Sequence, residues 1–163
     1  MGMPVPPETE VTEEAILRFN DPAIRAVGVP GGGGYANAAD LALFYQALLH
    51  GGLDGTQVWA QATLEDARRI RSGDLQDMMF NKPANRGLGI IISGDESRSF
   101  RGFGKTNSPD AFGHNGAGGQ LAWVDPATGI SLAYLTPGHD RNSVRQARRG
   151  VAISSLAAVC AAS

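Results

Sequence analysis

The sequence predicts an α/β protein of the α+β type, in which an antiparallel sheet is flanked by helices. Three observations lead to this prediction. Apolar residues recur at helical spacing after Asn37, two apolar runs flank the turn Asp125–Gly129, and a second amphipathic stretch follows Ser143. The 163 residues, 42% of them hydrophobic and 18% charged, are enough for one domain with a single core.

The N-terminal part carries weak structural signals. Met1–Glu10 contains three prolines and two acidic residues, which predicts a tail without regular structure. Thr12 offers a cap for a short helix over Glu13–Asn20, which begins with two acidic residues. We therefore expect residues 1–28 to form a tail and a short helix, and residues 29–163 to form the main portion.

A long helix follows a run of four glycines. Gly31–Gly34 predicts a hinge or turn, because a phosphate-binding loop needs a preceding strand and a following Lys that are absent here. Asn37 offers an N-cap with Asp40 at the third helical position, and Gly51 and Gly52 end the helix. The apolar face of this helix is formed by Leu41, Phe44, Tyr45, Leu48 and Leu49.

The middle of the chain alternates turns with short elements. Leu53–Gly55 predicts a turn, and Thr63–Ile70 a further helix. Leu88–Ser93 is apolar, rich in β-branched residues and bounded by glycines, which predicts a buried strand. Ser97–Thr106 is polar and punctuated by glycine, and we expect it to be mostly loop.

The stretch Phe112–Asp125 combines glycines with a polar pair, His114 and Asn115, before it becomes an ordinary strand pattern. Glycines weaken a strand, so their presence indicates that another group approaches the backbone here. The turn that follows, at residues 126–129, predicts an antiparallel hairpin with Ile130–Leu135. The sequence therefore predicts three strands and then a terminal helix over Ser143–Cys160, with Val144, Ala147, Val151 and Ile153 facing the sheet and the arginines facing water.

Composition excludes several classes of function. A net charge of −2 and a pI near 5.9 give no basic field for nucleic acid, and Arg141, Arg145, Arg148 and Arg149 are typical of a solvated helix face. One cysteine, Cys160, excludes an internal disulfide and a Cys pair for zinc. We expect no cofactor, no metal and no membrane span, and a soluble chain that, as it stands without an export signal, is cytoplasmic.

Three short motifs are better explained without a catalytic or binding role. Gly104-Lys105-Thr106 resembles the end of a nucleotide-binding loop, but the required earlier glycine is replaced by Ser99. Tyr35-Ala36-Asn37 contains a Tyr-x-Asn triplet, but Asn37 is already explained as a helix cap. Lys105-Thr106-Asn107 lacks the glycine of a Lys-Thr-Gly motif.

His114-Asn115-Gly116 is the strongest candidate motif. A lone His on a half-exposed strand is more often satisfied by its neighbours than catalytic. Here Gly116, Gly118 and Gly119 remove side chains where a ligand would contact the main chain, and a backbone N–H at such a place can stabilise an oxyanion.

Two blocks of the chain resemble one family. Gly31–Gly55 and Phe112–Thr136 resemble segments of the serine β-lactamase-like hydrolases, which include class C β-lactamases, their esterase relatives and low-molecular-weight penicillin-binding proteins. The resemblance covers essentially Val29–Ala158 and implies that 29–163 is the C-terminal portion of a β-lactamase/transpeptidase-like domain, which is incomplete. It implies that His114 takes the place of the Lys of Lys-Thr-Gly, that Asn115 and Gly116 take the next two places, and that His in place of Lys favours an esterase-like or peptidase-like member.

The resemblance also implies catalytic roles. The N–H of Ala117 would form half of an oxyanion hole, beside His114, Asn115 and Gly116, and Gly118 and Gly119 would contact substrate. The family nucleophile lies in Ser-x-x-Lys, which this chain lacks: Lys82 and Lys105 are preceded at that spacing by Met79 and Gly102. Two hypotheses follow. Either the chain is the C-terminal part of a serine hydrolase acting on an ester, amide or β-lactam, or it is a non-catalytic binding or assembly module.

The resemblance has a consequence for association. In the family, strands from an N-terminal segment complete the sheet, so the strands present here would expose an edge and an apolar face. We expect self-association, or association with a complementary N-terminal half, and a small-molecule acyl substrate in the complete enzyme.

Overall fold

The computed structural model describes residues 13–160 and divides into two compact units between Ala36 and Asn37. The predicted tail at Met1–Glu10 and the cap at Thr12 lie outside the described residues. The boundary that the sequence places between residues 28 and 29 stays a prediction.

The first unit contains short helices. The helix predicted over Glu13–Asn20 is confirmed as α1 (Glu13–Leu17), continued by the 3-10 turn η1 (Arg18–Asn20). Helix α2 (Pro22–Val27), which the sequence analysis missed, starts with proline at its first position, where the absent N–H costs nothing. The Tyr35 hydroxyl donates a hydrogen bond to the carbonyl oxygen of Phe19, so this Tyr already has a partner within its own unit.

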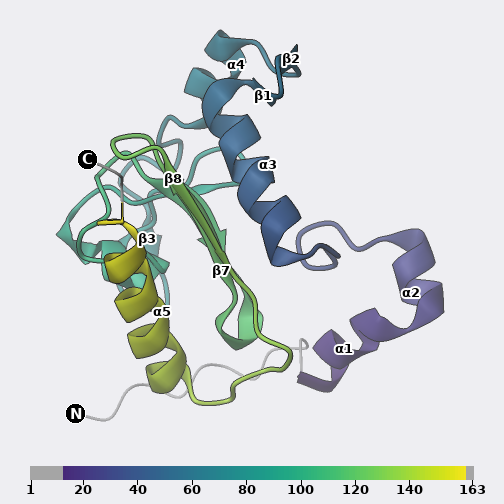
Figure 1. Cartoon of the computed structure of the whole chain (residues 1–163). Coiled ribbons are helices and arrows are strands. Elements are labelled where there is room, and N and C mark those ends of the chain that lie inside the picture. The colour runs from purple at the N-terminus through teal and green to yellow at the C-terminus, as the bar shows by residue number, and fades with distance from the viewer. Residues whose placement is uncertain (1–12, 161–163) are drawn as a thin grey trace. The chain divides into compact units, whose positions relative to one another are not determined.

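The second unit is built on a four-stranded antiparallel sheet with the order β5-β6-β7-β8 (Figure 1). The sheet strands are β5 (Ile91–Ile92), β6 (Phe112–Asn115), β7 (Leu121–Asp125) and β8 (Ile130–Tyr134). The other elements are α3 (Ala38–His50), β1 (Gly52–Leu53), β2 (Thr56–Gln57), α4 (Gln61–Ala67), β3 (Gln76–Asp77), β4 (Lys82–Pro83), η2 (Glu96–Arg101), η3 (Ala117–Gly119) and α5 (Ser143–Ala157). This arrangement confirms the predicted antiparallel sheet flanked by helices.

The two faces of the sheet are covered by different helices. Side chains alternate along a strand, so Ala122 and Val124 of β7 pack with Tyr45 of α3, whereas Leu121 and Trp123 belong to the opposite cluster. That opposite cluster also contains Ile91, Phe103, Ala111 and Ala158. Figure 1 shows α3 on one side of β7 and β8 and α5 on the other. Both faces of the sheet are therefore covered by packed side chains. Exposed polar residues that could bind a ligand are expected at the strand ends and turns.

Helix α3 is formed by the signals that the sequence offers. The Asn37 side chain accepts a 2.9 Å hydrogen bond from the N–H of Asp40, and Gly51 ends the helix in the left-handed region at φ 87°. Tyr45 is buried, and Leu41, Leu48 and Leu49 pack beside it. Phe44, predicted on the same face, is 47% exposed and has its ring 6.3 Å from that of Trp59. The predicted face is thus correct except at Phe44.

Helix α5 has the predicted position but a different packing face. Gly150 and Ser154 are buried, whereas Val144 is 56% exposed and Ala147 is also exposed. A Cβ at Gly150 would lie 3.1 Å from the Leu121 side chain, so the helix approaches the sheet through its small residues. The prediction that Val144 and Ala147 pack on the sheet is wrong, because the large side chains of β7 occupy the space between helix and sheet.

Three other predicted elements differ from the structure. Helix α4 ends at Ala67 rather than Ile70, since Arg71 leaves to donate its N–H to the carbonyl of Arg86 at 2.7 Å. The strand predicted over Leu88–Ser93 is limited to Ile91–Ile92, because residues 87–90 form a turn in which the Gly87 N–H bonds the Ile90 carbonyl. The loop predicted over Ser97–Thr106 contains η2, whose cap is the Asp95 side chain.

The segment Gly104-Lys105-Thr106 attaches to α5. The Lys105 N–H donates to the Ser155 hydroxyl at 2.9 Å, and the Thr106 hydroxyl donates to the Ser155 carbonyl at 2.6 Å. These contacts give the motif a structural explanation. Within residues 13–160, no helix is long and apolar enough to cross a membrane.

Candidate active site

The predicted polar pair, His114 and Asn115, lies at the solvent-exposed C-terminal end of β6, an inner strand of the sheet. Strand β6 begins with buried Phe112 and Gly113 and ends with exposed His114 and Asn115. His114 is opposite Ala122 of β7, so the prediction that this His stands on a strand beside a sheet partner is correct. Gly113 allows the close approach to β7, because a Cβ there would lie 2.1 Å from the Ala122 carbonyl oxygen.

The chain folds back directly after the polar pair. Gly116 donates its N–H to the carbonyl of Gln120 at 2.8 Å, and residues 117–119 form the single turn η3 between β6 and β7. The stretch Phe112–Asp125 is therefore two antiparallel strands rather than one, which raises the predicted three strands to four. Gly118 and Gly119 adopt φ values of 81° and 98°, a region that favours glycine.

The turn brings the other predicted site residues to the end of β6. Gly116 and Ala117 are exposed, and Ala117 is the first residue of η3. A backbone N–H in such an exposed turn is of the kind that can donate to an oxyanion. The structure thus gathers His114, Asn115, Gly116 and Ala117 at one corner of the sheet.

Gly118 and Gly119 are packed against the start of α5. A Cβ at Gly118 would lie 3.0 Å from His139, and one at Gly119 would lie 2.6 Å from the Arg149 guanidinium. The Asp140 N–H also donates to the Gly118 carbonyl at 3.4 Å. Contact of these two glycines with substrate stays a prediction, while their contact with their own chain accounts for the absence of side chains.

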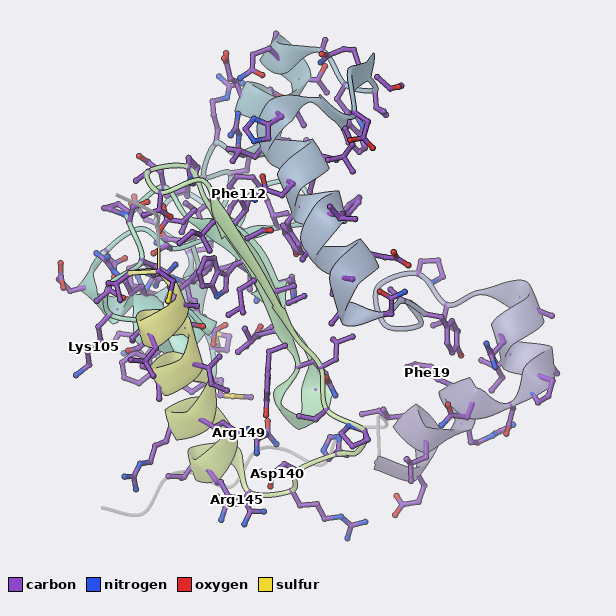
Figure 2. The ribbon with its side chains drawn as sticks, in the orientation of Figure 1. Phe19, Lys105, Phe112, Asp140, Arg145 and Arg149 are labelled. Atoms are coloured by element: carbon purple, nitrogen blue, oxygen red, sulfur yellow. The ribbon has the colours of Figure 1, made fainter. Side chains whose placement is uncertain are left out.

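Asp140 joins this turn to two arginines of α5. Its carboxylate accepts from Arg145 at 2.6 and 2.9 Å and from Arg149 at 3.2 Å (Figure 2). Hydrogen bonding from Arg145, together with the N–H of Asn142, holds the pKa of the Asp140 carboxyl well below its usual range. These contacts therefore favour the charged form of the carboxylate.

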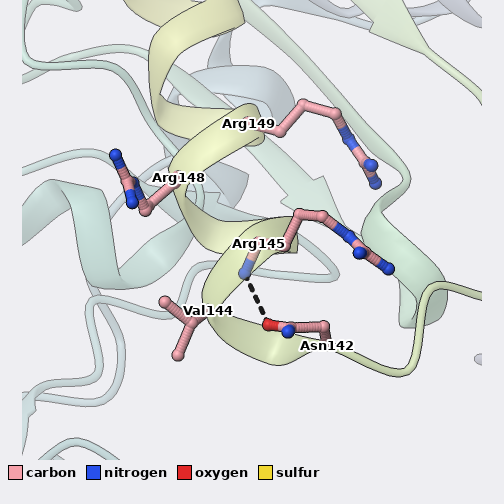
Figure 3. A pocket seen from close by; sticks show the side chains of 5 residues that line it. All are labelled: Asn142, Val144, Arg145, Arg148 and Arg149. Carbon is pink, nitrogen blue, oxygen red and sulfur yellow. Dashed lines mark hydrogen bonds between the residues drawn. The ribbon is translucent and has the colours of Figure 1, made fainter.

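An open pocket of about 630 Å³ lies at the N-terminal end of α5 (Figure 3). The Asn142 side chain caps the helix by accepting from the Arg145 N–H at 2.9 Å. The side chains of Arg145 and Arg148 are exposed, as predicted for a solvated helix face, whereas that of Arg149 is only 29% exposed. The pocket is lined by Asn142, Val144, Arg145, Arg148 and Arg149, and none of these is a predicted site residue.

Sequence reasoning missed one residue beside His114. Arg86 lies 28 positions earlier in the chain, and its Nη1 atom is 3.4 Å from Nε2 of His114. The other ring nitrogen, Nδ1, is 2.5 Å from the carbonyl oxygen of Asn115. No local pattern could have indicated Arg86, because the contact depends on how the segment before β5 meets the sheet.

Comparison with solved structures supports the fold. The fold resembles solved β-lactamase and esterase structures. A β-lactamase from Mycobacterium bovis shares 29% identity, with a TM-score of 0.59 over 72% of this chain and 42% of that chain. EstA from Arthrobacter nitroguajacolicus Rue61a, at 24% identity and a TM-score of 0.58, covers 90% of this chain and 39% of its own, and supports the fold alone.

The sequence comparison identifies the family. Residues 3–156 match the family model Beta-lactamase, so the chain belongs to the β-lactamase family. The esterase/β-lactamase LipL of Mycobacterium tuberculosis is 32% identical over 108 residues, which are 66% of this chain and 23% of LipL. The chain thus spans about a quarter of the length of this curated relative.

Proposed function

We propose that this chain is the C-terminal part of a serine hydrolase that cleaves ester, amide or β-lactam bonds through an acyl-serine intermediate. The main observation behind this proposal is the corner of the sheet at the end of β6, where His114, Asn115, Gly116 and Ala117 are exposed together. The chain that carries this corner belongs to the β-lactamase family. Because the chain has no Ser-x-x-Lys, the nucleophile comes from residues outside these 163.

Each residue at the corner has a distinct role in this proposal. The Ala117 N–H donates to the oxygen that becomes negative as the serine attacks the acyl carbon. His114 and Asn115 line the substrate side, and Gly116 leaves room for the acyl group beside the strand. Gly118 and Gly119 present backbone to the substrate. Loss of one oxyanion donor typically costs ~100- to 1000-fold in rate, so this part of the enzyme is essential without being sufficient.

Labelling with active-site probes tests the proposal. The 163-residue chain is incubated with a fluorophosphonate and, separately, with a chromogenic cephalosporin, and its intact mass is measured. We expect no adduct on the chain alone, and an acylated serine on a complementary segment that carries Ser-x-x-Lys once the two are combined. A stoichiometric adduct on the chain alone would show that a serine here is activated without the motif.

Two histidine variants make the test specific to the corner. His114→Gln is expected to slow acylation of the combined protein, and His50→Gln serves as the matched control because His50 is exposed at the end of α3. Equal rates for both variants would remove His114 from the site. Ligand binding without acylation, with the complementary segment present, would favour the non-catalytic binding module instead.

The free edge of the sheet supports the expected association. Strand β8 pairs with β7 on one side and has no further strand beside it within residues 13–160. Its residues Ile130–Tyr134 include no charge and no proline, which are the usual protections of an edge strand. We propose that β8 pairs with a complementary N-terminal half or, without it, with a second copy. A strictly monomeric species in sedimentation velocity at high concentration would contradict pairing with a second copy.

A further inference from the structure

We propose that Arg86 is a positioning residue of the candidate site, whose guanidinium fixes His114 as the neutral tautomer with its proton on Nδ1. The inference starts from the two partners of the imidazole ring. Tautomers are assigned from such partners, because each ring nitrogen of a neutral His either donates or accepts.

Each partner of the ring has only one possible role. The carbonyl oxygen of Asn115, 2.5 Å from Nδ1, can only accept, so Nδ1 carries the proton. The guanidinium of Arg86, 3.4 Å from Nε2, can only donate, so Nε2 presents its lone pair.

Arg86 is held from several sides. Its N–H donates to the Ser72 hydroxyl at 3.0 Å, its backbone forms an antiparallel bridge with Ile91 of β5, and its carbonyl accepts from Arg71. Beyond the ring, the guanidinium meets the Asp77 carboxylate, with 3.9 Å between Nη2 and Oδ2. Asp77 is itself fixed, because its side chain accepts N–H groups of the turn after β3. An anchored backbone and a carboxylate on the far side direct the guanidinium at His114.

The charge at the corner is therefore carried by Arg86. The neutral His114 tautomer offers a lone pair and no positive charge, while the guanidinium is a cation with N–H donors. In the proposed hydrolase, Arg86 supplies the cation of the corner and orients the His114 ring beside Gly116. The relevance to catalysis rests on the proposed function, but the tautomer itself is a property of this chain and is measured without any turnover.

Nitrogen NMR tests the proposal directly. Long-range ¹H–¹⁵N correlation spectra of the chain with ¹⁵N-labelled histidine show which ring nitrogen carries the proton. They are recorded about two pH units above the ordinary histidine pKa of ~6.5. The chain has three histidines, and the His114 signals are those lost in His114→Gln. We expect the wild-type His114 proton on Nδ1. A proton on Nε2 overturns the proposal, whatever the outcome of the labelling experiment.

Variants of Arg86 test its part in fixing the ring. Arg86→Met removes the donor and is expected to populate both tautomers, whereas Arg86→Lys keeps a donor and is expected to keep the proton on Nδ1. Arg69→Met is the matched control, because Arg69 is a surface arginine paired with Asp66. Tryptophan fluorescence of buried Trp123 verifies folding, and Arg86→Ala replaces any variant that does not fold. A variant without the donor whose spectrum equals the wild type overturns the proposal.

Discussion

The hydrogen bond between Trp123 and Ser154 offers a sharp test of how α5 is held on the sheet. The indole Nε1 donates to the Ser154 hydroxyl at 3.0 Å, and both side chains are buried, at 1% and 0% exposure. Ser154→Ala removes the acceptor while it changes the volume of the side chain very little. The indole N–H is then buried without a partner, since water has no access to it.

The size of the effect follows from this burial. A buried donor left unpaired costs about 1–3 kcal/mol of folding free energy. A domain of ordinary stability has about 5–15 kcal/mol, so the variant still folds. With a urea m-value of about 2 kcal/mol per molar, the unfolding midpoint falls by about 0.5–1.5 M.

Urea unfolding followed by near-ultraviolet circular dichroism measures this shift. Ser143→Ala is the matched control, because Ser143 is an exposed serine at the first position of the same helix. Trp123→Phe removes the donor, and the double variant gives the coupling energy between the two side chains. A Ser154→Ala cost within about 0.5 kcal/mol of zero, or strictly additive effects of the two changes, would refute the reasoning.

Three further outcomes follow from other contacts. Burial raises the pKa of Tyr45 to about 12, so between pH ~10 and ~12 the unfolded chain loses a proton that the folded chain keeps. Stability should fall there by about 1.4 kcal/mol per pH unit in urea titrations, and Tyr45→Phe should remove the slope. Gly104→Ala would place a Cβ 2.3 Å from the backbone nitrogen of Ser155, and a loss of about 1–3 kcal/mol is expected in the same assay. Wild-type stability of Gly104→Ala in urea would show that the loop moves away freely. The pKa of Asp140 is held low by Arg145, so the stability it contributes is present above pH ~4 and lost as pH falls below that value. Asp140→Asn should flatten the acid limb of the thermal melting profile, and an unchanged acid limb would contradict this.

Elements with strong local signals were predictable from the sequence. Helix α3 carries its own cap at Asn37 and its own glycine stop, so its limits agree with the structure to within one residue. The hairpin of β7 and β8 is determined by its turn, since Asp125 accepts the N–H groups of Thr128 and Gly129 through its carbonyl. In both cases the information lies within a few residues of the element that it defines.

Features that depend on distant packing were not predictable. The face that α5 presents is determined by β7, since Gly150 lies against Leu121 and Ser154 accepts a hydrogen bond from Trp123, whereas helical periodicity alone favoured Val144. The turn after Asn115 also depends on α5 and on the segment before it, because Gly119 lies against Arg149 and Gly118 against His139. Helical periodicity reflects the residues of one element and carries no information on its contacts with residues far away in the sequence.

The candidate site likewise has a part that was predictable from the sequence and a part that was not. His114, Asn115, Gly116 and Ala117 are consecutive, so a motif can contain them, and the structure keeps them together. Arg86 reaches His114 only because its segment bridges to β5, which pairs with β6. A site assembled across a sheet is therefore visible in sequence only on the strand that carries most of it.

The turn between β6 and β7 shows how α5 and the candidate site depend on each other. Gly118 and Gly119 face His139 and Arg149, so one side of the turn is fixed by the start of α5. The adjacent Gly116 and Ala117 remain exposed. Asp140 ties this arrangement to the helix, because its N–H bonds the Gly118 carbonyl while its carboxylate holds Arg149. An oxyanion donor must be fixed in place before the reaction begins, since that preorganisation is the source of its effect. In the proposed hydrolase, the packing of these two glycines on the chain itself would hold the preceding Ala117 N–H in place for the oxyanion.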